Sequence, residues 1–197
     1  MSKTLTPQQG LDKVGLTVET VVKRIMRTFE RATTDEFLQG LVWYFDAKQI
    51  VTDLSSQSDY TAAQVAAAMA HLSPRLRWKQ NVDSIEQLVL SGKVPNYVMS
   101  GPANRAKAAL VAANPELTFG KKALKTLNFS RNVSGCSNSV TVDVWAANVA
   151  GIAESELKLT GVYDAIAHCY RLAAKRAGVT PAQIQAITWI VVRGSAD

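Results

Sequence analysis

Apolar residues recur at intervals of three and four along most of the chain, which is the spacing of one face of an α-helix. The pattern predicts helices over residues 17–29, 34–45, 61–72, 83–92, 104–114, 121–133, 161–178 and 181–193. Residues 140–149 are also apolar, but their pattern fits a strand as well as a helix. Because the linkers are short and no strand-like alternation is present, the sequence predicts an all-α fold of about eight to ten helices.

Capping residues mark several helix ends. Thr61 begins an alanine-rich helix, which we expect to stop before Pro74 because proline disfavours helix in the residue that precedes it. Thr34 or Asp35 is the expected cap of the helix that precedes this one. Gly178 is expected to end the helix that begins near residue 161.

Length and charge narrow the class of protein. The chain has 197 residues, 47% of them hydrophobic, which is enough for one well-buried domain or two small halves that share a cleft. Lysine and arginine outnumber aspartate and glutamate by 22 to 16, and this favours an anionic partner, either nucleic acid or a membrane surface. No secretory signal and no apolar run of about 18 residues is present, so we expect a cytoplasmic protein that does not span a membrane.

Cysteine and histidine give no sign of a metal or a cofactor. Cys136 and Cys169 are too few for a disulfide framework or for a cluster with four thiolate ligands. His71 and His168 have no second ligand at metal-binding spacing, so we interpret each as a packed or surface histidine. We therefore expect neither a metal nor a cofactor.

One acid lies inside the apolar segment SVTVDVWAANVAG, residues 139–151. An unpaired carboxylate buried there would cost several kcal/mol, so the charge of Asp143 must be held or used. Asp143 could cap a helix that begins at Val144. It could also be a catalytic group set in an apolar wall, and the two explanations are compatible.

Two segments combine cations with features that suit contact with nucleic acid. LSPRLRWKQN, residues 72–81, places cations around an indole, which suits phosphate contact together with stacking on bases or wedging between them. Its candidate residues are Arg75, Arg77, Trp78 and Lys79. FGKKALKTLNFSRN, residues 119–132, places lysines after a glycine at an expected helix start, where backbone N–H groups bind phosphate. Its candidates are Gly120, Lys121, Lys122 and Lys125. The alternative for both segments is a solvated surface, with the indole packed into the core.

The order and spacing of these motifs resemble the helix-hairpin-helix DNA glycosylase superfamily, and in particular its endonuclease III-like branch. The catalytic aspartate of that family lies in a V-D-x-H-x-x-R-V motif. Val142, Asp143 and Val149 match this motif. Trp145 stands in place of its histidine and Asn148 in place of its arginine.

The resemblance extends to the catalytic lysine of the bifunctional members and to the residue that wedges into the DNA duplex. The K-T-A-N segment of the bifunctional members corresponds to Lys125–Asn128, which precedes Asp143 at the distance seen in the family, 18 residues from lysine to aspartate. Leu72 and Ser73 match the L-S pair before the family's DNA wedge, which places Arg75 at the wedge.

Two other segments also resemble parts of the family. SGPANRAK, residues 100–107, resembles its second phosphate-contacting loop. This loop contributes Gly101, Arg105 and Lys107. Residues 189–194 are similar to the segment before the iron–sulfur cysteines, but the chain ends three residues later, so we expect no cluster.

The hairpin motif L-P-G-V-G-x-x-T-A departs most from the family. FGKKAL, residues 119–124, takes its place and keeps only Gly120. Either the hairpin is remodelled, with Lys121 and Lys122 supplying charge, or the alignment shifts and one of these two lysines faces the pocket.

The resemblance covers residues 35–194 and implies a single two-lobed, all-α domain over residues 1–197, with a cleft between the lobes and residues 1–34 as an extension helix. It implies a monomeric protein that binds duplex DNA, flips a base and cleaves its N-glycosidic bond. Asp143 would stabilise positive charge on the sugar and orient a water or an amine. Lys125 would form a Schiff base if the protein also has AP-lyase activity. Such small sequences also resemble bacteriophage proteins, which act in the host cytoplasm.

Two alternatives stay open. The same fold could modify bases in phage DNA or bind DNA without cleavage, which the missing motif histidine and hairpin glycines favour. A helical module that binds another protein needs only the amphipathic helices and the basic surface.

Overall fold

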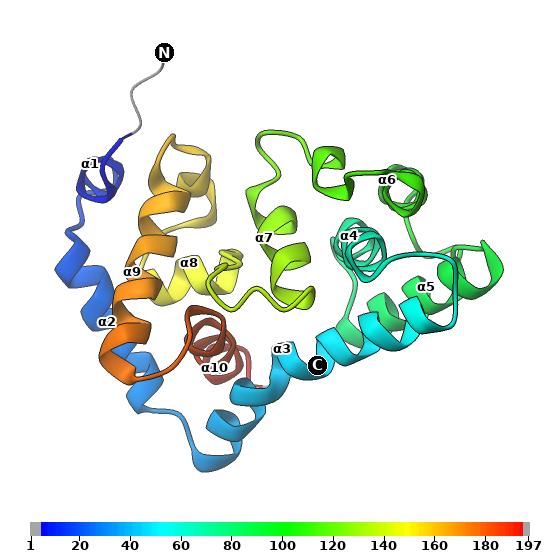
Figure 1. The fold of residues 1–197 in the computed structure, drawn as a ribbon. Coiled ribbons are helices and arrows are strands. Elements are labelled where there is room, and N and C mark those ends of the chain that lie inside the picture. Colours follow the sequence, from blue (N-terminus) through cyan, green and yellow to red (C-terminus); the bar gives the residue numbers. More distant parts are fainter. Residues whose placement is uncertain (1–4, 195–197) are drawn as a thin grey trace. The chain divides into compact units, whose positions relative to one another are not determined.

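The computed structural model describes residues 5–194, which form ten α-helices and two 3₁₀-helices and contain no strand. The prediction of an all-α fold is therefore confirmed (Figure 1). In chain order the elements are α1 (Pro7–Asp12), α2 (Val18–Glu30), α3 (Thr34–Ser56), α4 (Ala62–Leu72), α5 (Trp78–Ser91), α6 (Ser100–Val111), η1 (Pro115–Thr118), α7 (Leu124–Val133), α8 (Val144–Ala150), η2 (Glu154–Lys158), α9 (Val162–Ala177) and α10 (Pro181–Arg193).

The chain divides into two compact units. Unit 1 contains the described residues up to Tyr44 and those from Ser137 onward, and unit 2 contains Phe45–Cys136. The chain passes from unit 1 to unit 2 within α3, and it re-enters unit 1 in the segment that follows α7.

Unit 1 is built around α9, which packs against α1, α2 and α10 (Figure 1). The first 34 residues were expected to be one extension helix, but their described part forms two helices. Both are integral to the unit, because α1 packs against α9 and α2 presents a fully buried face of Val21, Val22 and Ile25.

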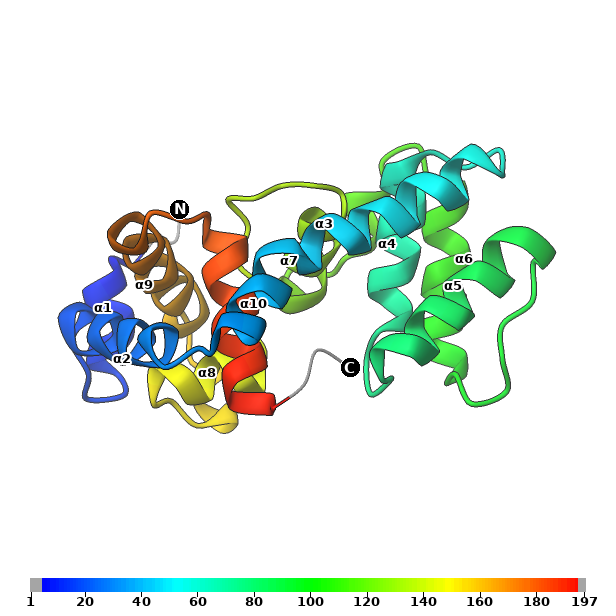
Figure 2. The ribbon, with the colours of Figure 1, turned by 90° about the horizontal axis from the view of Figure 1, so that it is seen from below.

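Unit 2 is built around α4, which packs against α5, α6 and α7 (Figure 2 shows α5 and α6 beside α4). Every residue of α4 from Val65 to Leu72 is buried. A helix that is apolar on all sides has to be surrounded by other elements. The alanines of this segment leave little side-chain volume between α4 and its neighbours, so α4 serves as the core of the unit.

The capping predictions are confirmed at several helix ends. Thr61 and Thr180 each form a capping box with the glutamine three residues later. Gly178 ends α9 with φ at 71°, a left-handed conformation that glycine adopts without steric cost. These ends are local structures, which is why the sequence shows them.

The predicted cap of α3 is wrong by one residue. Thr33 Oγ1 accepts a hydrogen bond from the backbone N–H of Glu36 at 3.3 Å, and Glu36 Oε2 accepts one from the N–H of Thr33 at 2.8 Å. This reciprocal pair assigns the cap to Thr33, instead of Thr34 or Asp35.

Gly40 gives a test of the packing inside unit 1. A Cβ atom added at Gly40 would lie 2.6 Å from Cα and 2.7 Å from the backbone nitrogen of Ile187 on α10. We expect Gly40→Ala to lower the free energy of unfolding by about 1–3 kcal/mol, because α3 and α10 must separate. Urea unfolding followed by circular dichroism measures the change. Gly120→Ala is the control, because a Cβ there has no neighbour within 4 Å, and it should shift stability by less than about 0.5 kcal/mol. An unchanged unfolding midpoint in Gly40→Ala would contradict this close approach.

Candidate functional site

Asp143 is the N-cap of α8, as one of the two explanations of its position predicted. Its Oδ1 accepts a hydrogen bond from the backbone N–H of Ala146 at 2.8 Å. At the other end of this short helix, the guanidinium of Arg24 donates to the carbonyl oxygen of Ala150 at 3.0 Å. Both ends of α8 are therefore fixed by side chains, and the Asp143 carboxylate has a defined orientation.

The apolar surroundings of Asp143 are only partly buried. Val140 and Val142 lie in the core, whereas Asp143 is half-buried, and Val144 and Trp145 are 43% and 37% exposed. The expectation of a carboxylate deep inside an apolar run is therefore corrected. The helix begins directly after Asp143, which turns the next two side chains toward solvent.

The segment that leads to Asp143 is held by a tyrosine from α9. The Tyr163 hydroxyl accepts a hydrogen bond from the N–H of Val142 at 3.1 Å and donates one to the carbonyl oxygen of Val140 at 3.0 Å. Both contacts are buried. Backbone polar groups of an extended segment need such partners when no neighbouring strand supplies them.

Two more tyrosines lie within the electrostatic influence of Asp143. Burial raises the pKa of Tyr44 and that of Tyr170 well above the usual range, and the negative charge of Asp143 adds to the rise of both pKa values. Both hydroxyls are therefore protonated donors at neutral pH. The Tyr44 hydroxyl donates to Gln185 Oε1 at 2.8 Å.

An aromatic row continues from Tyr44. The ring centroids of Trp43 and Tyr44 are 4.7 Å apart, and those of Trp43 and Trp189 are 5.9 Å apart. The Arg193 guanidinium carbon lies 4.6 Å from the centre of the Trp189 ring. This row joins α3 to α10 and ends in a cation, a combination that suits contact with bases and phosphates.

In unit 2, the predicted wedge residue Arg75 has an unusual backbone. It is the one non-glycine residue with positive φ, 67°, in the part of the chain that the structure describes. The N–H of Leu76 donates to the carbonyl oxygen of Ser73 at 3.2 Å, so Pro74 and Arg75 are the central residues of a type II β-turn. Glycine is usual at the position of Arg75, and another residue costs about 1–2 kcal/mol there. Strain of this kind collects at functional positions.

The basic segment around Trp78 was expected to be a loop, but its second half is helical. The N–H of Arg77 donates to Gln80 Oε1 at 3.1 Å, and α5 begins at Trp78, so Trp78 and Lys79 lie in its first turn. Trp78 is half-buried, as expected for an indole that packs partly into the core. Lys79 is exposed and pairs with Asp83 at 3.2 Å.

The second phosphate-loop candidate begins α6. Gly101, Arg105 and Lys107 all lie on the first turns of this helix and are exposed. Burial lowers the pKa of His71 at the end of α4, and the positive charge of Arg105 adds to this effect.

The lysine-rich segment before α7 differs from the prediction. The helix begins at Leu124, and Lys121 and Lys122 occupy a turn in front of it instead of the helix itself. The N–H of Ala123 donates to the carbonyl oxygen of Gly120 at 2.8 Å and closes this turn. All these candidates are exposed, and so is Lys125 in the first turn of α7.

Arg131, the last cation of that segment, is already paired. Its Nε and one terminal nitrogen donate to the two carboxylate oxygens of Glu116 at 2.8 and 2.7 Å. This bidentate pair engages two of the three nitrogens of the guanidinium.

The positive charge of the chain is concentrated in one stretch. Residues 75–125 contain nine lysines and arginines against three acids, a net charge of +6, which equals that of the whole chain. This stretch, which includes Lys125, lies entirely in unit 2, whereas Asp143 belongs to unit 1.

Sequence reasoning missed the groups around Asp143. Tyr44 comes from α3, whereas Tyr163, Tyr170 and Gln185 come from α9 and α10, more than 100 residues later in the chain. Each is a single polar residue within an amphipathic pattern, which gives no local signal. The row of tryptophans on α3 and α10 was missed for the same reason.

The described residues add two negative findings. They contain no group of three or more histidine, cysteine, aspartate or glutamate side chains that could hold a metal ion. Within the same residues, no helix combines the length and the apolar character that crossing a membrane requires.

The protein is thus all-helical, with an oriented, half-buried carboxylate in one compact unit and a dense cationic stretch in the other. The chain belongs to DUF7178, a family of unknown function, whose match covers residues 8–196. No curated protein and no solved structure matches the chain.

The tyrosine that holds the Asp143 segment can be tested by stability. We expect Tyr163→Phe to lower the free energy of unfolding by about 1–3 kcal/mol, because two buried backbone groups lose their partner. Chemical unfolding of both proteins measures the difference. Tyr60→Phe is the matched control, since within the described part of the chain the Tyr60 hydroxyl makes no hydrogen bond. Equal effects of the two substitutions would contradict the role given to Tyr163.

The burial of His71 predicts that the protein loses stability in acid. It is buried, bonded to Thr118 Oγ1 at 2.8 Å and stacked on Phe119, and burial, aided by the charge of Arg105, lowers its pKa from 6.5 to about 4. The unfolded chain therefore binds a proton between pH 6.5 and 4 that the folded protein does not bind. The free energy of unfolding should fall by up to about 3 kcal/mol as pH drops through this window.

Unfolding midpoints measured from pH 7 to pH 4 test this expectation. His71→Gln should remove this part of the pH dependence, whereas His168→Gln should keep it. A pH dependence that survives in His71→Gln would assign the effect to other groups.

Proposed function

We propose that the protein is a DNA glycosylase-like enzyme that binds duplex DNA, flips one base out of the stack and breaks its N-glycosidic bond. The observation that carries this proposal is the carboxylate of Asp143, which is half-buried and oriented by the N–H of Ala146. Exposed Val144 and Trp145 follow it directly. A carboxylate that is already oriented beside apolar groups attracts a developing positive charge more strongly than one in bulk water.

The proposed reaction needs one acid and one water molecule. The bond between sugar C1′ and the base nitrogen breaks, and its electron pair leaves with the base. Asp143 stabilises the positive charge that this leaves on the sugar. Water then attacks C1′, and its proton passes to Asp143 and on to the departing base.

The cationic stretch of unit 2 is the proposed DNA-binding surface. Exposed cations that contact phosphates fix the register of a protein on a duplex without reading its sequence. The proposed contacts are Arg75, Arg77, Trp78, Lys79, Gly101, Arg105, Lys107, Gly120, Lys121 and Lys122. In this proposal, the two compact units are the two lobes of a helix-hairpin-helix glycosylase, and the Gly120–Ala123 turn is its remodelled hairpin.

Lys125 is the proposed amine of a lyase step. Its exposed position in the first turn of α7 supports access to DNA. In place of water, this amine would attack C1′ and displace the base, and opening of the C1′–O4′ bond would give a Schiff base with the sugar. β-Elimination of the 3′ phosphate would then cut the strand.

A second candidate function is DNA binding without cleavage. The hydrogen bond from Ala146 shows that the Asp143 carboxylate has a structural task as a helix cap. Trp145 offers a half-exposed indole where the resembling family has a histidine. These two features favour a protein of the same fold that holds DNA, or presents it to a modifying enzyme.

Asp143→Asn separates the two candidates. Asparagine is as good an N-cap as aspartate, so the free energy of unfolding should change by only a few tenths of a kcal/mol. Excision should nevertheless fall by about 100-fold or more, because the charge is lost. The measurement uses labelled duplexes that carry uracil, oxidised, alkylated or hydroxymethylated bases, each read before and after alkali. Asp164→Asn, on the exposed side of α9, is the control and should keep full activity.

Borohydride trapping on the same duplexes tests the lyase step. A trapped adduct that disappears in Lys125→Ala would assign the amine to Lys125. If wild-type protein excises no base from any duplex but still binds DNA with a steep salt dependence, the second candidate function replaces the first.

A further inference from the structure

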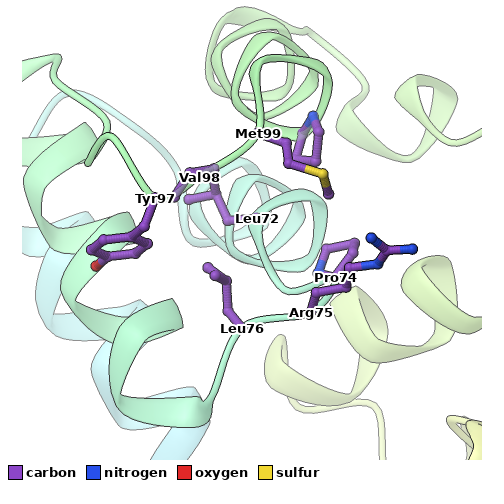
Figure 3. Close-up of a pocket in the computed structure, with 8 residues that line it drawn as sticks. Leu72, Pro74, Arg75, Leu76, Tyr97, Val98 and Met99 are labelled. Atoms are coloured by element: carbon purple, nitrogen blue, oxygen red, sulfur yellow. The ribbon is translucent and has the colours of Figure 1, made fainter.

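A small pocket opens in unit 2 where α4 ends (Figure 3). Its volume is about 160 Å³, and it lies between the end of α4, the turn after it and the segment that leads into α6. Its walls include Leu72, Leu76, Tyr97, Val98 and Met99, with Arg75 as the one charged side chain of its lining. Pockets for drug-sized ligands begin at about 300 Å³, so this one suits a single ring or a single side chain.

The walls of the pocket are apolar, yet open to solvent. Tyr97 and Met99 are each 48% exposed. Figure 3 shows Tyr97 and Leu76 on one side of the pocket and Met99 and Arg75 on the other. An aromatic ring and a thioether at the mouth of a pocket are soft, polarisable partners for a planar ring.

The ring of Tyr97 is held in place. Its hydroxyl donates to the carbonyl oxygen of Gln80 at 3.4 Å and accepts a hydrogen bond from Ser84 Oγ at 3.2 Å. Both partners belong to α5. The wall of the pocket is therefore formed before any ligand binds, which reduces the entropy that binding has to overcome.

Arg75 is the charged residue of the turn that lines this pocket. Its left-handed backbone, φ 67°, is the position where a type II turn favours glycine. A residue kept there against its steric preference is a sign of a functional requirement. A guanidinium beside an apolar pocket fits a ligand that joins a ring to an anion.

The charge of the chain segment that contains the pocket favours nucleic acid as that ligand. The stretch from Arg75 to Lys125 has a net charge of +6, and the exposed Arg105 and Lys107 lie on α6, whose leading segment forms part of the pocket. An apolar side chain of a protein partner would explain the size of the pocket but not this charge.

We propose that this pocket binds a single unpaired nucleobase, whose neighbouring phosphate contacts Arg75. The proposal rests on the DNA binding in the proposed function, but it does not require catalysis by Asp143. It gives unit 2 a second task besides neutralising phosphates: to recognise a base that has left the stack.

The test measures Kd by fluorescence anisotropy for three labelled duplexes. One carries a single unpaired adenine, one carries an abasic residue at that position, and one is fully paired. We expect wild-type protein to bind the unpaired base about tenfold more tightly than the abasic residue, which is the size of one stacking contact. Equal Kd values for these two duplexes would overturn the proposal, and they are also what a pocket for a protein side chain would give.

Filling the pocket should remove this preference. Val98→Phe places a ring in the pocket and should bring the ratio of the two Kd values close to one. Val111→Phe adds the same ring at the other end of α6, where Val111 is 76% exposed, and should keep the tenfold preference. If Val98→Phe does not fold, Tyr97→Leu tests the same point by removing the stacking ring. A preference that survives in a folded Val98→Phe or Tyr97→Leu protein would overturn the proposal.

Two substitutions distinguish the contribution of the Arg75 side chain to binding from the effect of its strained backbone on stability. Arg75→Ala and Arg75→Gly should both weaken binding to the unpaired-base duplex and reduce its salt dependence by about one ion. Arg75→Gly alone should also raise Tm by about 2–4 °C, because glycine adopts the turn without strain. Wild-type affinity in Arg75→Gly would rule out the contact between Arg75 and the phosphate.

Asp143→Asn distinguishes this inference from the proposed function. It should keep the tenfold preference for the unpaired base even when excision is lost. A protein that shows the preference but excises no base supports the pocket and contradicts the glycosylase proposal. A protein that excises a base but shows no preference supports the glycosylase proposal and contradicts the pocket.

Discussion

The candidate site of unit 1 depends on how one buried extended segment satisfies its backbone. Residues 140–142 cross the core without a strand beside them, and the Tyr163 hydroxyl supplies the partner for the N–H of Val142 and for the carbonyl of Val140. Directly after this segment α8 begins at Val144, with Asp143 as its N-cap. Tyr163 of α9 thus holds the segment before Asp143, and the N–H of Ala146 orients the carboxylate itself.

Unit 2 is organised around a buried helix instead of a buried extended segment. Its central helix α4 is buried on all sides, so the elements around it are placed by their contacts with α4. At the end of α4, His71 contacts Thr118 and Phe119, and Leu72 lines the same pocket as Met99. The segments that carry the cations of residues 75–125 are therefore gathered around one buried helix.

Asp143 and Arg75 differ in what folding alone explains. An aspartate at an N-cap stabilises its helix, so the position of Asp143 would be favourable without any function. An arginine in a left-handed turn position destabilises the fold, and no hydrogen bond of the turn requires its side chain. The fold alone therefore accounts for the position of Asp143 but not for that of Arg75.

The sequence by itself determined the helical class, most helix positions and the caps at Thr61, Gly178 and Thr180, since these depend on residues within one or two turns of each other. It also located the cationic stretch and identified Asp143 as an exception in an apolar run. Only the tertiary structure placed Tyr44, Tyr163 and Gln185 near that segment and formed the pocket beside Arg75. The physical reason is distance along the chain: Tyr44 and Gln185 are 141 residues apart, and a contact of that kind leaves no spacing in the sequence that a local pattern could reveal.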